Sequence, residues 1–109
     1  MEDERIIDLY WQRSQEAISR TDEKYGRLCT KISLNILSNA QDAEECVSDT
    51  YMALWNSIPP QRPKCFQPFV AAIIRNLSLM KLREQYARKR GSGEFDLVLD
   101  ELKNTIASD

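Results

Sequence analysis

Apolar residues recur along the chain at intervals of three and four positions, which is the spacing of a helix with one buried face. The longest such pattern follows Ser14, a residue type that can cap a helix, and continues to about residue 38. A shorter helix with one apolar side is expected over residues 3–12. The apolar stripe of the longer helix consists of Ile18, Tyr25, Leu28, Cys29, Ile32 and Ile36.

Two further helices are expected in the second half of the chain. Asn39 is a favourable N-cap, and residues 40–57 then separate apolar side chains from acidic ones on opposite faces. Residues 66–89 show a similar pattern, with Pro68 in the first turn, where a helix does not need a backbone N–H. The residues expected to be buried are Ala43, Cys46, Val47, Thr50, Tyr51, Leu54 and Trp55 in the first helix, and Phe69, Val70, Ile73, Ile74, Leu77 and Leu82 in the second.

Proline and glycine divide these patterns into elements. All four prolines lie within residues 58–68, where they exclude a continuous helix and predict an extended, fairly stiff connection. Gly-Ser-Gly at 91–93 ends the last helix. The expected fold class is therefore all-α, a compact bundle of about four helices over residues 1–90. An acidic tail over residues 91–109 is interpreted as an inter-domain linker.

Charge is distributed unevenly, although the net charge is only −2. Residues 62–90 contain eight Lys and Arg and one acidic residue, whereas residues 41–61 contain four acidic residues and no Lys or Arg. A row of cations along one helix can follow the phosphates of a nucleic acid, and nearby Asn or aromatic side chains can contact bases. The pattern therefore favours nucleic-acid binding over a merely solvated surface.

Residue types that catalyse reactions are scarce in this chain. It contains no His, no glycine-rich phosphate loop and no HExxH motif, so we expect neither enzymatic activity nor a cofactor. The conceivable metal ligands are Asp42, Glu44, Glu45 and Asp49, of which Glu45 and Asp49 lie one helical turn apart, but a single helix does not surround a cation. A solvated or protein-binding acidic face is the preferred interpretation, and no metal is expected.

The three cysteines are far apart in the sequence and indicate a reducing compartment. Cys29 and Cys46 lie on the apolar stripes and are expected to be small core residues, while Cys65 lies at the edge of the proline-rich connection. No apolar run approaches the ~20 residues of a membrane span, and the first residues are too acidic for a signal peptide. We therefore expect a cytoplasmic protein.

Two segments resemble a known protein family. DAEECVSDTYMALW, at residues 42–55, resembles the second conserved region of the extracytoplasmic-function (ECF) sigma factors, a branch of the sigma-70 family of RNA polymerase subunits. FQPFVAAIIRNLSLMKLREQYARKR, at 66–90, resembles the helix that follows it, and KYGRLCTKISLNILSNAQDAEE, from residue 24, resembles the approach helix. The resemblance covers about residues 5–90 and implies the helical bundle called region 2.

The resemblance also implies two binding surfaces and a function in transcription initiation. The acidic helix would dock on the clamp helices of the largest subunit of core RNA polymerase, and the following loop and helix would recognise and melt the promoter −10 element by capturing its non-template strand. By position, the polymerase-binding residues would be Asp42, Glu45, Ser48, Asp49 and Met52. The DNA-binding residues would be Arg62, Lys64, Phe66, Arg75, Asn76, Lys81, Arg83, Arg88, Lys89 and Arg90.

Other functions remain compatible with the sequence. A helical adaptor could bind polymerase or a regulator, such as an anti-sigma factor, without contacting DNA, and it would tolerate charge reversal over residues 81–90. An enzyme would depend on a metal or small molecule, and the missing His counts against it. Family members continue into a helix-turn-helix region that nothing after residue 93 resembles. We therefore expect either part of a longer protein or a naturally short chain, and favour the former.

Overall fold

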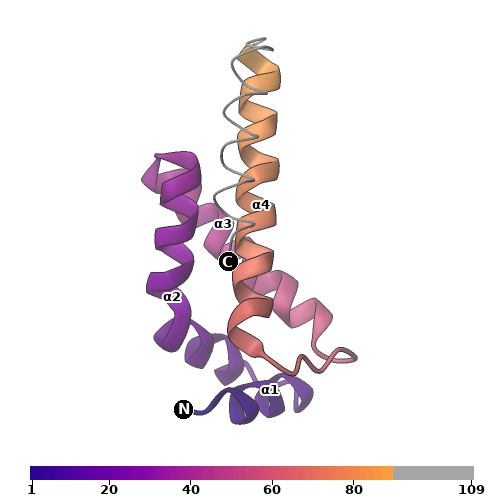
Figure 1. Cartoon of the computed structure of the whole chain (residues 1–109). Helices are drawn as coiled ribbons and strands as arrows, with labels where there is room; N and C mark the ends of the chain where they lie inside the picture. Colours follow the sequence, from indigo (N-terminus) through magenta and orange to yellow (C-terminus); the bar gives the residue numbers. More distant parts are fainter. Residues whose placement is uncertain (90–109) are drawn as a thin grey trace.

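The computed structural model describes residues 1–89, with side chains through Arg88. This part of the chain forms four helices and no strand, which confirms the predicted all-α bundle (Figure 1). Arg90 and the predicted linker over residues 91–109 lie outside the described residues. The helices are α1 (Asp3–Trp11), α2 (Glu16–Leu37), α3 (Ala40–Ser57) and α4 (Phe66–Lys89).

The two long helices, α2 and α4, each pack against all the other helices of the bundle. Figure 1 shows α2 and α4 side by side. Helix α3 passes behind α4 and packs against both long helices, and α1 lies across the base of the bundle. The C-terminal end of α4 extends beyond the other helices, so its last turns have few neighbours within the described part of the chain.

Local signals set the ends of the helices. Asn39 Oδ1 accepts a hydrogen bond of 3.0 Å from the backbone N–H of Asp42, which confirms the predicted N-cap of α3. The helices α3 and α4 have the bounds that the sequence predicts, while α1 ends one residue earlier than expected. The helix α2 ends where Ser38 adopts a left-handed backbone, with φ of 56°.

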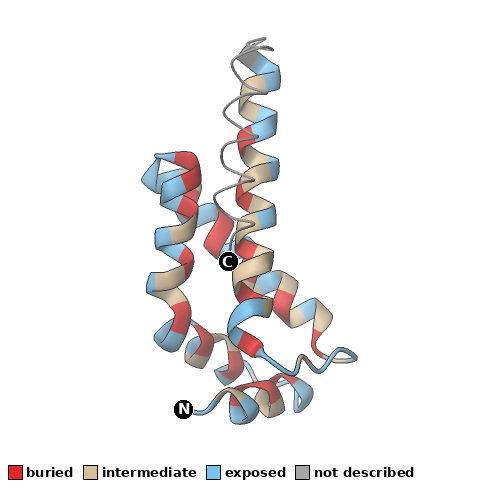
Figure 2. Cartoon of the chain, viewed as in Figure 1, coloured by how far each residue is buried: buried red, intermediate tan, exposed pale blue. Residues whose placement is uncertain are grey.

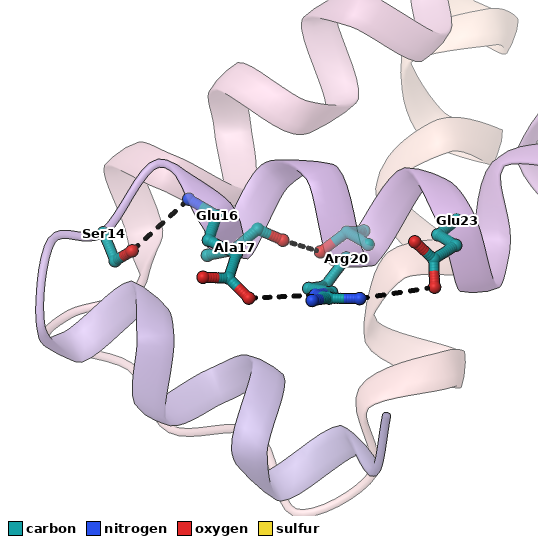
Figure 3. A network of polar contacts seen from close by, with 6 residues as sticks. Ser14, Glu16, Ala17, Arg20 and Glu23 are labelled. Atoms are coloured by element: carbon teal, nitrogen blue, oxygen red, sulfur yellow. Dashed lines mark hydrogen bonds and ion pairs between the residues drawn. The ribbon is translucent and has the colours of Figure 1, made fainter.

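The start of α2 is held by short-range polar contacts (Figure 3). Ser14 Oγ lies 3.4 Å from the backbone nitrogen of Glu16, which is a long contact in place of the expected cap. One turn further on, the Arg20 guanidinium bridges the carboxylates of Glu16, at 3.0 Å, and Glu23, at 3.5 Å. These pairs lie on the exposed side of α2 and leave the opposite side free to pack.

The apolar stripes of all four helices meet in one core (Figure 2). Cys29 is 0 % exposed and Cys46 2 % exposed, which confirms their prediction as core residues, while Trp55 is only partly buried. No helix within residues 1–89 is both long enough and apolar enough to cross a lipid bilayer. The largest fully buried side chains are Tyr10, Phe66, Ile6, Leu54, Ile58, Ile74 and Val70.

Small polar residues occupy the contact between α2 and α4. Ser33 and Ser78 are both fully buried, and their Oγ atoms lie 2.8 Å apart in a hydrogen bond. Their short side chains let the two helices approach closely, and each hydroxyl satisfies the other. Tyr10 and Thr21 form a similar buried pair at 2.7 Å. In the described part of the chain, no buried side-chain nitrogen or oxygen lacks a hydrogen-bond partner.

Gly26 lies where the surface of α2 meets a side chain from α3. Tyr51 Oη donates a hydrogen bond of 2.6 Å to Asp22 Oδ1. A Cβ atom at position 26 would lie 2.7 Å from the same carboxylate oxygen and 3.4 Å from Tyr51 Oη. Glycine costs about 1 kcal/mol within a helix compared with alanine. At this position it leaves room for a hydrogen bond between two helices.

Candidate functional site

One face of α3 is acidic and points away from the core. We call it the acidic face and define it as Asp42, Glu45, Ser48, Asp49 and Met52. These residues are spaced three and four positions apart, opposite the buried stripe of the same helix. Met52 is 57 % exposed, and all members except the half-buried Asp42 are exposed. An exposed apolar side chain within an acidic patch is suited to contact with a protein partner.

Basic residues follow the connection between α3 and α4 and continue along α4. We call these residues the basic surface. Arg62 and Lys64 are exposed in the connection, Arg83 and Arg88 are exposed on the C-terminal half of α4, and Asn76 is exposed between them. Of the other predicted residues, Arg75 and Lys81 are half-buried, and the side chain of Lys89 and all of Arg90 lie outside the described residues.

Phe66 is a correction to the predicted DNA-binding set. Its ring is 1 % exposed and packs in the core, with its centroid 5.8 Å from that of Tyr25 and 6.2 Å from that of Tyr10. Burying an aromatic side chain is worth a few kcal/mol, so the ring is held inside and is not offered for stacking on a base. The spacing of four residues to the buried Val70 was the signal that placed Phe66 on the core side.

The acidic face and the basic surface touch one another. Lys81 Nζ lies 2.8 Å from Glu45 Oε1, and one turn further along α4 Gln85 Nε2 donates a 2.6 Å hydrogen bond to Asp42 Oδ2. The hydrogen bond with Glu45 raises the pKa of the Lys81 ammonium. These two contacts lie side by side between α3 and α4, which run antiparallel here. The sequence predicts the exposure of Glu45 and Lys81 but not their contact, and it gives no signal for Gln85.

Helix α1 and the turn after it hold the connection that contains Arg62. Arg13 donates hydrogen bonds to the backbone oxygens of Trp55, at 2.8 Å, and Ile58, at 3.0 Å. Its guanidinium carbon also lies 3.8 Å from the centre of the Trp55 ring. Arg62 is paired with Asp8 on α1. Neither Asp8 nor Arg13 is indicated by the sequence, because nothing local points to a partner more than 40 residues away.

The described residues offer little to a chemical reaction. No group of three or more Cys, Asp or Glu that could hold a metal ion occurs within residues 1–89. Burial raises the pKa of the Cys29 thiol to about 11 and also raises the pKa of the Cys46 thiol, which keeps both protonated and unreactive. An open hollow of about 520 Å³ on α2 is lined by residues of mixed charge, among them Asp22 and Arg27, and shares no residue with either surface.

Comparison with known proteins identifies one family. Residues 22–88 match the model of a protein family described as Sigma-70 region 2. The match covers α3, α4 up to Arg88 and the part of α2 that begins at Asp22, and so includes the acidic face and the basic surface up to Arg88. No curated protein and no solved structure matches the chain.

Proposed function

Because the chain belongs to the sigma-70 region 2 family, and so to the sigma factors of transcription initiation, we propose that its two surfaces serve polymerase and promoter binding. The acidic face docks on the clamp helices of the largest subunit of core RNA polymerase. The connection and α4 engage the −10 element and capture its non-template strand. The family is not one of enzymes, and the chain acts through binding energy alone.

The observation that supports this proposal best is the place of the two surfaces within the matched region. The acidic face is exposed on a helix that is fixed at its start by the Asn39 cap and along its length by the core. A rigid, preformed surface loses little entropy on binding. Its acidic character suits a basic surface on the partner, and Met52 adds an apolar contact.

The basic surface supports the DNA part of the proposal. Arg83 and Arg88 are exposed on α4 within reach of phosphates, and Asn76 offers an exposed amide that can hydrogen-bond to a base edge. The anchoring of the connection by Arg13 presents Arg62 and Lys64 from a defined position. Opened strands can be captured in this way without hydrolysis of a nucleotide.

The finer parts of the proposal rest on the resemblance of residues 42–55 and 66–90 to the ECF branch. We place the chain in that branch and in the cytoplasm, where polymerase acts. We also propose an anti-sigma factor as a partner of this chain. Its expected role would be to cover one or both surfaces.

Co-elution of the chain with purified core RNA polymerase tests the docking surface. Wild-type chain should co-elute, and the variant Glu45→Lys/Asp49→Lys should not, because two reversed charges oppose the same partner surface. The matched control is Glu4→Lys/Glu44→Lys, which makes the same charge change at exposed positions outside the acidic face. Circular dichroism should confirm that all three chains are folded. Equal binding by the two double variants would refute the docking surface.

A protein adaptor that does not touch DNA is the second candidate function. It is favoured by one observation, because Arg62 and Lys81 are already paired with Asp8 and Glu45. The adaptor and the promoter-binding protein differ in the effect of salt on DNA binding. That difference gives the second test.

Fluorescence anisotropy with a labelled single strand measures the salt dependence of binding. The slope of log affinity against log salt should be about 1.4 smaller in magnitude for Arg83→Met/Arg88→Met than for wild type, since each single-strand phosphate contact contributes about 0.7. The control Arg5→Met/Arg27→Met removes two exposed arginines from α1 and α2 and should leave the slope unchanged. Identical slopes for the two double variants would favour the adaptor.

A further inference from the structure

The contact between Lys81 and Glu45 joins a residue proposed to bind DNA to a residue proposed to bind polymerase. The ammonium and carboxylate lie 2.8 Å apart, which is the length of a charge-assisted hydrogen bond. Glu45 can form an ion pair with this lysine or with a cation of the docking partner. In the same way, Lys81 can be neutralised by Glu45 or by a phosphate.

The pair is placed where both ends can be reached by a partner. The side chain of Glu45 is 61 % exposed and that of Lys81 21 % exposed. A pair this close to solvent is weak, and its loss changes an equilibrium by about two- to five-fold. The contact is therefore strong enough to hold the Lys81 ammonium on Glu45 in the free domain. It is also weak enough for a binding partner to replace it.

The neighbouring hydrogen bond between Gln85 and Asp42 still joins α3 and α4 when the ion pair opens. Gln85 donates to Asp42 at 2.6 Å on the same side of the α3–α4 contact, and both helices also contribute buried residues to the core. Breaking the Lys81–Glu45 contact consequently needs only side-chain rotation. Helices α3 and α4 stay in place, and Lys81 can turn toward solvent.

We propose that the Lys81–Glu45 ion pair couples polymerase docking to DNA binding, with the free domain holding Lys81 on Glu45 and docking releasing it to a promoter phosphate. This inference rests on the proposed function. Coupling between two binding sites is reciprocal, so DNA that takes Lys81 also frees Glu45 and strengthens docking by the same factor. The device makes the domain bind DNA less well alone than on polymerase.

The Asp8–Arg62 ion pair is a comparison case that would not couple DNA binding to polymerase docking. It also joins an acidic residue to a cation of the basic surface, but Asp8 lies on α1 and outside the acidic face. DNA has to break this pair whether or not polymerase is bound. Only the Lys81–Glu45 pair has a member on each surface among the ion pairs described in residues 1–89.

DNA binding by the free 109-residue chain tests the first half of the coupling. The probe is a fluorescein-labelled DNA single strand of mixed sequence at low salt. Glu45→Gln should bind it about two- to five-fold more tightly than Glu44→Gln, an exposed neighbour that loses the same charge. In a Lys81→Met background the two Gln variants should bind equally, because the released cation is gone.

Polymerase binding in the absence of DNA tests the second half. Lys81→Met should bind purified core polymerase about two- to five-fold more tightly than wild type, since Glu45 is no longer occupied. Lys31→Met removes the same charge from an exposed position on α2, outside both surfaces, and should leave polymerase affinity unchanged.

The outcomes separate this inference from the proposed function. If wild type binds polymerase and DNA but Glu45→Gln matches Glu44→Gln in DNA binding, the coupling is refuted and the proposed function stands. If Lys81→Met and Lys31→Met bind polymerase equally, the coupling is refuted as well. Failure of wild type to bind polymerase, or of wild type and Glu45→Gln to bind DNA, would overturn both.

Discussion

Arg13 connects two parts of the chain that are 42 residues apart in the sequence. Its side chain crosses from the turn between α1 and α2 to the end of α3, where helix carbonyls lack partners within the helix. A cation at this end also interacts favourably with the helix dipole. Its backbone φ of 57° is left-handed, which turns the chain from α1 into α2. One residue therefore ties the turn between α1 and α2 to the end of α3.

Replacement of Arg13 by Met tests this role. Loss of the two hydrogen bonds and of the contact with the Trp55 ring should lower the free energy of unfolding by about 1–2 kcal/mol. Urea denaturation followed by circular dichroism gives the value. Arg5→Met, an exposed residue on α1, is the control and should change stability by less than about 0.5 kcal/mol. Equal midpoints for the two variants would contradict the assignment.

Residue-level roles were predictable where the signal was local. The buried cysteines follow from the apolar spacing, and the exposure of Glu45 and Asp49 follows from the opposite face of the same helix. Phe66 was wrongly assigned to DNA because its place beside basic residues was given more weight than its spacing to Val70. The partner of Arg13 had no local signal, since it depends on how distant helices pack.

Helix α3 is the element on which both proposed activities depend. It presents the acidic face, packs against α4, and ends at the connection that contains Arg62. Its start depends on Asn39, whose side chain accepts from the third residue of the helix. Helix bounds of this kind are readable from sequence, because caps and prolines act within a few residues. The register of Lys81 against Glu45 is not readable in this way, since it depends on the angle and spacing between two helices.

Replacement of Asn39 by Ala should lower the free energy of unfolding by about 1 kcal/mol, because the Asp42 N–H loses its acceptor. Asn39→Ser retains a capping oxygen and should cost much less. Thermal unfolding of both variants with wild type measures the difference. A serine variant as unstable as the alanine variant would show that the side-chain cap is not what Asn39 contributes.

Across the whole molecule, tyrosine hydroxyls connect helices. Tyr10 on α1 bonds to Thr21 on α2, and Tyr51 on α3 donates to Asp22 on α2. Tyr25 on α2 donates to Asp3 at the start of α1, at 2.7 Å. Each ring is anchored in or against the core while its hydroxyl ties two elements together, so the bundle is closed by polar contacts as well as by apolar packing.

These contacts predict a loss of stability in alkali. Burial, followed by hydrogen bonds to carboxylates, raises the pKa of Tyr25 and Tyr51 above the ordinary value of 10, and burial also raises the pKa of Tyr10. A raised pKa in the folded chain contributes stability that is fully present below pH 10 and is lost as the pH rises above it, because unfolded tyrosines then lose protons first.

Denaturation at a series of pH values above 10 measures this effect. The free energy of unfolding of wild type should fall more steeply than that of Tyr51→Phe, by up to about 1.4 kcal/mol per pH unit. Tyrosinate absorbance of the folded chain should appear at a higher pH than that of the urea-unfolded chain. Parallel curves for wild type and Tyr51→Phe would show that Tyr51 ionises equally easily in both states.

The space left by Gly26 has a consequence for the inheritance of this sequence. A side chain at that position would place a Cβ atom 2.7 Å from Asp22 Oδ1, so this carboxylate, which accepts from the Tyr51 hydroxyl, would have to shift. The residues at these three positions are therefore expected to change together in evolution. Among descendants of a common ancestor, a glycine lost at position 26 should be accompanied by loss of the acid at 22 or of the hydroxyl at 51, and lineages that retain both should retain the glycine.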